Sequence, residues 1–419
     1  MLLQFNFKNF KSFKDDTILD LSATKITEHS DRLFTIGEEK ILPIAAIYGA
    51  NASGKSNVVA AYHFMETYVV NSFAYGGESE EKKVTTKKLK LTPFLFDTET
   101  KLGASTFEVF FINRENTKDK IYNYGFSLDS EGIVEEWLNC KSKTSKKYRR
   151  IFYRDRQELD TPGLAKVYKE SIQVSLEKEV LIVSLGAKLK INELKIVRDW
   201  FYKNNYVDFG DPIANVFLSS VIPKDFADDE EVQNKVISYF SSFDNSIVGF
   251  NVEELKKDDD KIGYKIESVH KMTNGETATL PFKEESSGTL KMFSLFPHLQ
   301  NALKNGSVLF VDELNARLHP LLVRNIIVTF LNKKININGA QLIFTTHDPW
   351  QLSTNLLRRD EIWFTEKNKE GVSTLYSLAD FVDEDGVKIR KDESYEKNYL
   401  LGKYGAIPSL SSLDMFKEN

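Results

Sequence analysis

The sequence predicts an α/β protein with a mixed, largely parallel sheet, an antiparallel β subdomain and a mostly helical insertion. Three observations predict this fold. Residues 41–48 (ILPIAAIY) are almost wholly apolar and run into a glycine, as a strand buried on both faces does. Residues 106–128 alternate apolar and polar side chains, which indicates two strands of an antiparallel hairpin. The last third alternates apolar strands with helical segments, which favours a parallel sheet.

The elements follow in order along the chain. Strands are expected near residues 3–7 and 17–22, then the apolar strand, a helix over 55–70 and the hairpin. The middle contains helical stretches at 164–205 and 230–241, without a heptad pattern long enough for a coiled-coil arm. The last third is predicted to contain helices at 289–304 and 320–334 and strands at 308–311, 341–346, 361–365 and 372–376. We therefore expect an N-terminal lobe at 1–135, an insertion at 136–261 and a C-terminal lobe at 262–419.

Composition narrows the class of protein. Hydrophobic residues make up 41% and charged residues 28% of the 419 residues, which indicates a globular protein rather than a disordered one. The single cysteine, Cys140, excludes both a disulfide within one chain and a CxxC metal site. No apolar run approaches the roughly 18 residues of a membrane span, so we expect a cytoplasmic protein without a membrane partner. The net charge of −5 means that any nucleic-acid contact needs a local basic patch.

The strongest motif is Gly49-Ala50-Asn51-Ala52-Ser53-Gly54-Lys55-Ser56, a GxxxxGKS phosphate loop between the apolar strand and the first helix. Its glycines let backbone N–H groups surround a phosphate, and the helix N-terminus adds a favourable dipole. Lys55 is expected to bridge the β- and γ-phosphates of ATP, and the Ser56 hydroxyl to ligate Mg²⁺. The predicted nucleotide-binding residues here are Gly49, Asn51, Ala52, Ser53, Gly54, Lys55, Ser56 and Asn57.

Two acids end a later apolar strand. Residues 308–311 (VLFV) run into Asp312 and Glu313, which places both carboxylates at the carboxyl edge of the sheet, where nucleotides bind. Asp312 is expected to hold Mg²⁺, directly or through water. Glu313 is expected to polarise the attacking water as a general base.

Two further segments point to phosphate chemistry. The strand at 341–346 ends at His347, which we expect to reach the γ-phosphate. The stretch Glu285-Ser286-Ser287-Gly288-Thr289 precedes a helix and predicts a second anion-binding helix N-terminus.

These four elements, in this order, resemble the ATP-binding-cassette (ABC) ATPases and, more narrowly, their SMC/RecF-like branch. The segments SGKSN (53–57), NFKSF (9–13) and DELNARLHP (312–320) match that branch. The combination of ESSGT, DE…LHP and TTHDP is most similar to stand-alone ATPases allied to the OLD family and to the RloA/abortive-infection ATPases of anti-phage defence. LRRDEIW (357–363) and YLLGKYGAIP (399–408) also resemble segments of those small ATPases, so the resemblance covers roughly residues 1–135 and 262–408.

The resemblance implies a head-to-tail homodimer, with a higher oligomer as an option. Ser286, Ser287 and Gly288 of one copy would close over the γ-phosphate that is held by Lys55 of the other, so that ATP binding closes the dimer and hydrolysis opens it. Asn315 and Arg317 would lie in the D-loop at the interface, and Lys11 would approach the phosphates. The resemblance also implies a separate effector, a nuclease or toxin, because residues 348–419 are too few for a whole Toprim nuclease domain.

Two alternatives stay open. Residues 141–156 (KSKTSKKYRRIFYRDR) carry eight Lys or Arg and one acid, with aromatic rings between them. Such a strip can bind nucleic acid, as a RecF-like repair ATPase would, or can be an exposed charged hairpin. The family's Q-loop glutamine has no obvious counterpart, since the next glutamine after Gln4 is Gln157, and this absence favours a nucleotide-gated scaffold with little turnover.

Overall fold

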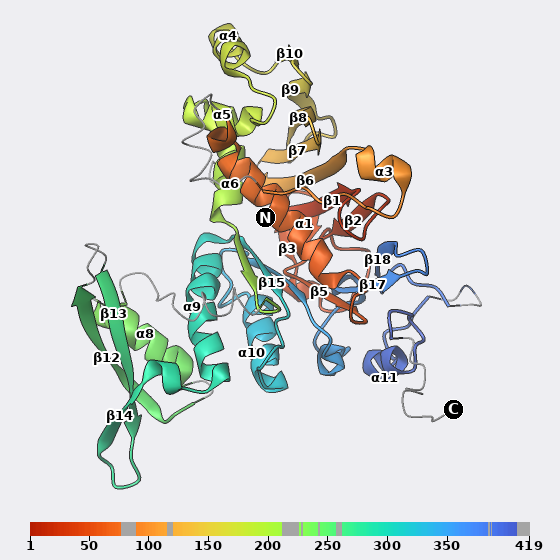
Figure 1. Ribbon diagram of the computed structural model, residues 1–419. Helices are drawn as coiled ribbons and strands as arrows, with labels where there is room; N and C mark the ends of the chain where they lie inside the picture. The colour runs from red at the N-terminus through yellow and green to blue at the C-terminus, as the bar shows by residue number, and fades with distance from the viewer. Residues whose placement is uncertain are drawn as a thin grey trace, which may run out of the picture.

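Two large sheets form the body of the molecule, with helix α1 (Lys55–Asn71) packed between them (Figure 1). On one side Phe64 of α1 packs on Phe107 of the antiparallel sheet, and on the other Tyr62 stacks on Phe310 of the parallel sheet. This computed structural model describes residues 1–76, 89–114, 120–211, 226–227, 229–241, 244–256, 262–383, 386 and 388–408.

The first sheet, of six strands, is parallel except at one edge. Its order is β11-β15-β16-β5-β17-β18, and only β18 runs antiparallel to its neighbour. The strands are β5 (Ile44–Gly49), β11 (Asn205–Asp208), β15 (Val308–Asp312), β16 (Gln341–Thr345), β17 (Ile362–Lys367) and β18 (Ser373–Ser377). Strand β5 from the first third of the chain lies between β16 and β17 from the last third, so segments distant in sequence form one sheet.

Alternate residues of these buried strands point to opposite faces, and each face has its own core. One face, with Ala45, Ile47 and Phe310, packs on α1 and the antiparallel sheet. The other face, with Ala46 and Tyr48, packs on helices α9 (Ser287–Asn305), α10 (Pro320–Leu331) and α11 (Tyr395–Leu400). The nearly continuous apolar runs in the sequence follow from burial on both faces.

The second sheet is antiparallel and has the order β10-β9-β8-β7-β6-β1-β2 among the described residues. Its strands are β1 (Leu2–Lys8), β2 (Thr17–Asp20), β6 (Ser105–Asn113), β7 (Lys120–Asp129), β8 (Gly132–Ser142), β9 (Arg149–Asp155) and β10 (Glu158–Asp160). Helices α4 (Lys166–Ser175), α5 (Ile182–Lys188) and α6 (Asn192–Lys203) share the core between this sheet and α1, and the short helix α3 (Thr98–Leu102) precedes β6. A two-stranded ribbon joins β3 (Phe34–Ile36) to β4 (Glu39–Ile41).

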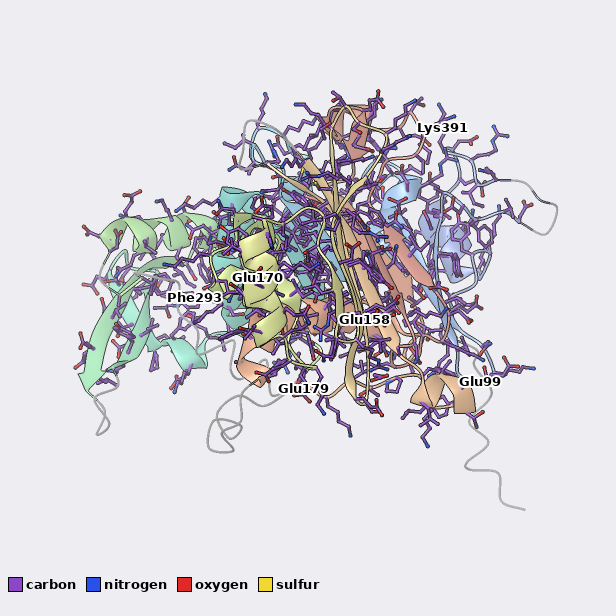
Figure 2. All side chains as sticks on the ribbon, turned by 90° about the horizontal axis from the view of Figure 1, so that it is seen from above. Glu99, Glu158, Glu170, Glu179, Phe293 and Lys391 are labelled. Atoms are coloured by element: carbon purple, nitrogen blue, oxygen red, sulfur yellow. The ribbon has the colours of Figure 1, made fainter. Side chains whose placement is uncertain are left out.

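A smaller unit projects from the body at the lower left of Figure 1. It consists of the antiparallel strands β12 (Ile247–Lys256), β13 (Ile262–Lys271) and β14 (Thr277–Pro281) with helix α8 (Glu230–Phe240). Its core is aromatic, and Phe293 of α9 joins it, with ring centroids 4.5 Å from Phe282 and 5.3 Å from Phe226. Figure 2 shows Phe293 at the junction between this unit and the body, so α9 belongs to both.

The predicted domain boundaries do not match these units. The 135/136 boundary falls inside β8, and the 261/262 boundary separates β13 from its partner β12. The predicted insertion is also not mostly helical, because β8, β9 and β10 extend the antiparallel sheet and β11 is an edge strand of the parallel one. The sequence does not show that β8 and β9 continue the antiparallel sheet, because residues 141–156 are rich in charge and only one face of the two strands is apolar and buried. No helix in the described part of the chain has the length and apolarity needed to cross a bilayer.

A buried charged pair anchors the antiparallel sheet to α5. The Glu136 carboxylate, fully buried, accepts the N–H groups of Ile182 (2.7 Å) and Val183 (3.1 Å) and the Tyr124 hydroxyl (3.0 Å). Arg154 lies 3.9 Å from Glu136 and donates to three carbonyl oxygens, those of Arg156, Glu177 and Val180. The pair therefore supplies hydrogen-bond partners for the free N–H groups in the first turn of α5 and for carbonyl oxygens of the loop before it.

This pair predicts how the stability of the folded protein depends on pH. Burial raises the pKa of Glu136 from 4.5 to about 7, against the opposing effect of Arg154. The folded state therefore holds the proton more tightly than the unfolded state, and stability is lost as pH rises from about 4.5 through 7, by at most about 3 kcal/mol. We expect wild type to lose stability relative to Glu136→Gln between pH 5 and pH 8, measured by urea unfolding. Glu135→Gln, on the more open neighbouring position, is the control, and a pH-independent difference for Glu136→Gln would contradict the assignment.

Candidate nucleotide site

The phosphate loop connects β5 to α1, and two of its glycines are required by close packing. Gly49 has a φ of +154°, and a Cβ there would lie 2.5 Å from the Thr365 carbonyl oxygen of β17. Gly54 has a φ of +116°, and its Cβ would lie 2.7 Å from the Ser373 hydroxyl of β18. Side chains are excluded at both positions, so the backbone of the loop lies directly against the neighbouring strands.

Lys55 turns back over this loop. Its buried amine donates to the carbonyl oxygens of Gly49 (2.8 Å) and Ala50 (2.9 Å). Burial lowers the pKa of Lys55, while the nearby Asp312 and Glu313 act in the opposite direction. The cation is thus held within the loop, where it can exchange carbonyl oxygens for those of a phosphate.

A layer of small polar side chains supports the loop from the N-terminal segment and β18. The Ser373 hydroxyl lies 2.7 Å from the Ser53 carbonyl oxygen and 2.8 Å from the Ser12 hydroxyl. Asn57 donates its side-chain amide to the same Ser12 hydroxyl (2.8 Å). Lys11, the neighbour of Ser12, lies within electrostatic reach of Asp208 and Asp312, and burial lowers its pKa. The structure thus brings the predicted residues Lys11 and Asn57 to the phosphate loop.

Asp312 ends β15 beside the start of α1. Its carboxylate is buried and accepts the hydroxyl groups of Thr345 (2.5 Å) and Ser56. Burial raises the pKa of Asp312, and these two hydrogen bonds partly offset the effect. Within the described ranges no group of three or more His, Cys, Asp or Glu residues could hold a metal by itself. One carboxylate beside one hydroxyl fits Mg²⁺, which usually takes few protein ligands and completes its shell with phosphates and water.

Glu313 has an unusual backbone conformation. Its φ is +52°, in the left-handed region, and its N–H donates to the Thr345 hydroxyl (2.8 Å). A non-glycine residue in this region carries strain of about 1 kcal/mol, and such strain is concentrated at functional sites. Thr345 therefore contacts both acids, because it accepts from the Glu313 backbone and donates to Asp312.

A cleft of about 1000 Å³ opens beside these groups. Its lining includes residues 49–53 of the phosphate loop, Glu313, His347, residues 365–368 at the end of β17, and the C-terminal residues Tyr399, Leu400 and 406–408. His347 follows β16 and lies 3.2 Å from the Asn315 side chain, which also accepts the Thr346 hydroxyl (2.9 Å). The volume is at the upper end of that found for small-molecule sites.

Ser286, Ser287 and Gly288, which we call the signature segment, lie at the start of α9 and outside the lining of this cleft. Ser286 caps the helix by accepting the Thr289 N–H (3.1 Å), and both serines are exposed. A Cβ on Gly288 would lie 3.3 Å from the Arg317 carbonyl oxygen, so the signature segment borders the predicted D-loop.

Two buried contacts connect the signature segment to its surroundings. Lys291, one turn along α9, donates to the carbonyl oxygens of Glu313 (3.1 Å), Leu314 (3.0 Å) and Ala316 (2.7 Å), and burial lowers its pKa to about 7. On the other side, Glu285 contacts His270 of β13 (2.6 Å) and accepts the Ser268 hydroxyl. The signature segment is therefore attached both to the turn that contains Glu313 and to the projecting sheet.

Asp208 is a site residue that the sequence analysis missed. It ends β11 directly opposite Asp312 in the parallel pairing, and its carboxylate accepts the N–H groups of Gly210 (2.8 Å) and Asp211 (3.0 Å). A Cβ on Gly210 would lie 3.4 Å from the Glu313 carboxyl carbon, so this turn borders the Glu313 side chain. β11 has four residues and is preceded and followed by polar sequence, so no periodic signal identified it as a sheet strand.

The basic strip at 141–156 is largely occupied by internal contacts. Arg154 is buried with Glu136, Arg156 pairs with Asp129 (2.6 Å), and Arg150 pairs with Asp160 (3.3 Å). Lys146, Lys147, Tyr148 and Arg149 remain exposed at the turn between β8 and β9. Nucleic-acid contact through this strip stays a prediction, now confined to the turn.

Comparison with protein families matches residues 44–350, from the start of β5 to just beyond His347, to one family model. The matched range covers well over half of the 419 residues and contains the phosphate loop, the signature segment, both acids and His347. Comparison with curated proteins gave no match. The chain therefore belongs to the family described as "AAA domain, putative AbiEii toxin, Type IV TA system".

Proposed function

We propose that this chain is a Mg²⁺-dependent ATPase of the ABC type whose two copies close head to tail around ATP. Membership of an AAA family implies nucleotide binding and ATPase activity. The observation that carries the dimer proposal is that the signature segment is exposed and lies outside the cleft that residues 49–53, Glu313 and His347 border. A phosphate in that cleft is therefore contacted from one side by this chain, and a second copy would supply the other side.

Each residue then has a role that its surroundings support. Lys55 and the loop N–H groups would bind the β- and γ-phosphates, since the amine is already held within the loop. Ser56 and Asp312 would hold Mg²⁺, which when bound neutralises charge on the phosphates. Glu313 would accept a proton from the attacking water, and His347, which borders the same cleft, would contact the γ-phosphate.

The second copy would contribute Ser286, Ser287 and Gly288. The start of α9 offers N–H groups and a dipole that attract a phosphate, and two exposed hydroxyl groups can donate to it. Asn315 and Arg317 of the D-loop border the signature segment and His347, so they would lie at the same interface. ATP favours closure only by as much as it binds the closed dimer better than the open one.

The proposed biological role is control of a separate effector, a nuclease or toxin, in defence against phage. The family is described by a toxin and a type IV toxin–antitoxin system, which supports an association with abortive infection. The role proposed for this chain is the nucleotide-dependent switch of such a system.

The test of the dimer uses a repulsive charge at the signature segment. Ser287→Glu adds an acid to the exposed first turn of α9, which is favourable for the helix but repels a phosphate. With Mg²⁺ and a non-hydrolysable ATP analogue, light scattering should show wild type shifting from 48.1 kDa to twice that mass, whereas Ser287→Glu stays at 48.1 kDa. Ser287→Glu should still bind the analogue to within about tenfold of wild type, because the cleft of its own chain is intact.

Two controls complete this test. Thr277→Glu, an equal charge on an exposed position of β14, should dimerise as wild type does. Lys55→Ala should lose both analogue binding and dimerisation. A wild type that binds the analogue yet remains at 48.1 kDa would contradict the head-to-tail dimer, and so would a Ser287→Glu monomer that no longer binds the analogue.

A further inference from the structure

The C-terminal segment, Tyr395–Pro408, packs against the strand that leads into the phosphate loop. It begins with α11 and continues through a turn, beside β17 and β18 in Figure 1. Tyr395, Tyr399 and Tyr404 are buried in the same core as Tyr48 of β5 and Phe364 of β17. This segment corresponds to the YLLGKYGAIP stretch, to which neither the catalytic roles nor the dimer assigns a task.

Tyr399 makes a direct contact with the phosphate loop. Its hydroxyl donates to the Ala406 carbonyl oxygen (3.3 Å) and borders the same cleft as Gly49. Burial raises the pKa of Tyr399, and the nearby Gly49 N–H partly offsets this effect. The ring is held by Phe364 at 5.5 Å, in a stacked arrangement, and by Tyr48 at 6.0 Å. The phenol thus lies between the first glycine of the loop and Ala406 of the C-terminal segment.

The segment itself is fixed to the sheet by close contacts. The Tyr376 hydroxyl of β18 donates to the Tyr404 carbonyl oxygen (2.6 Å). Gly405 has a φ of +67°, and a Cβ there would lie 2.9 Å from the Glu366 carboxylate and 3.0 Å from the Tyr376 hydroxyl. These contacts leave Tyr399 little freedom to move independently of β17 and β18.

The outer side of the segment forms one wall of the cleft. Leu400 is 60% exposed and Ile407 41% exposed, and both line the cleft together with Pro408. Glu313 and His347 line the same cleft. An anchored segment thus presents its apolar side chains to the space where the nucleotide is proposed to bind.

We propose that Tyr399 is a positioning residue of the nucleotide site, which fixes the first turn of the phosphate loop through the Gly49 N–H and couples nucleotide binding to the order of the C-terminal segment. This inference rests on the proposed function in taking the cleft as the nucleotide site. Because the coupling is reciprocal, a bound nucleotide protects the segment from exchange and proteolysis to the same extent that the segment favours nucleotide binding.

Tyr399→Phe tests the proposal, because it removes the hydroxyl and keeps the ring. We expect a fluorescent ATP analogue to bind about three- to tenfold more weakly, with kcat unchanged and KM raised. Hydrogen exchange at the Gly49 amide should accelerate in the nucleotide-free protein. Tyr404→Phe is the matched control, since its hydroxyl accepts from Asn398 (3.1 Å) and does not contact the phosphate loop.

The possible outcomes separate a positioning role from a merely structural one. Equal losses of thermal stability in the two variants, with neither the analogue affinity nor the Gly49 exchange rate changed in Tyr399→Phe, would overturn the proposal. Should wild type fail to bind the analogue, the proposed function fails, and the Gly49 exchange rate without nucleotide still decides whether Tyr399 holds the loop.

Discussion

Glu313→Gln should lower steady-state ATP hydrolysis by about 100-fold or more while ATP still binds. The amide keeps the size and hydrogen-bonding shape of the carboxylate but cannot accept a proton from water. The backbone of Glu313 is held by the Thr345 hydroxyl and by Lys291 on its carbonyl oxygen, so the substitution should leave the main chain in place. Phosphate release measures turnover, and a fluorescent ATP analogue measures affinity.

The control for this prediction is Glu276→Gln, an exposed carboxylate on the turn before β14. Its turnover should equal that of wild type. Unchanged hydrolysis in Glu313→Gln would contradict the assignment of Glu313 as the general base. Loss of both turnover and ATP binding would instead show that the carboxylate supports the phosphate loop.

Arg358→Met should destabilise the fold by about 3–5 kcal/mol, the largest effect on stability that we predict. The Arg358 guanidinium is buried and forms a two-point contact with Asp360, at 2.8 and 2.7 Å. It also donates to the carbonyl oxygens of Ile26 (3.3 Å) and Glu28. Removing it leaves the Asp360 carboxylate buried without its counter-ion, although Thr24 still donates to that carboxylate.

Urea unfolding measures this effect, and two further variants sharpen it. Arg358→Met combined with Asp360→Leu should be less destabilised than Arg358→Met alone, because no unpaired charge remains. Arg390→Met, which removes an exposed pair with Asp392, should change stability by less than about 0.5 kcal/mol. Equal stabilities for Arg358→Met and Arg390→Met would show that the buried pair contributes little.

The candidate nucleotide site at the carboxyl edge of the sheet could be located from sequence because its signals are local. A glycine-rich loop between an apolar strand and a helix, and a strand that ends in Asp312 and Glu313, are each contained in about ten residues. The shared carboxyl edge of β5, β15 and β16 follows from their parallel direction, whereas the order of the strands comes from the structure alone. Helix α1 and the β6–β7 hairpin also lie where their periodicity predicts.

What could not be predicted depends on contacts between distant segments. Asp208 is positioned by the pairing of the four-residue strand β11 with β15. Tyr399 is positioned by its packing on Tyr48 and Phe364. The sequence presents Arg154 as one cation of a basic strip, yet Arg154 pairs with Glu136, which lies directly opposite it on the neighbouring strand β8. Alternation of side chains in 132–155 indicates strands but does not reveal which sheet they extend.

The order of strands around β5 also bears on biosynthesis. This strand is made early, but both of its neighbours, β16 and β17, come from residues 341–345 and 362–367. A chain emerging from the ribosome therefore holds its phosphate-loop strand unpaired until most of the protein has been translated. Under the proposed function, products that end before residue 341 lack both neighbours of β5, and we expect them not to bind nucleotide.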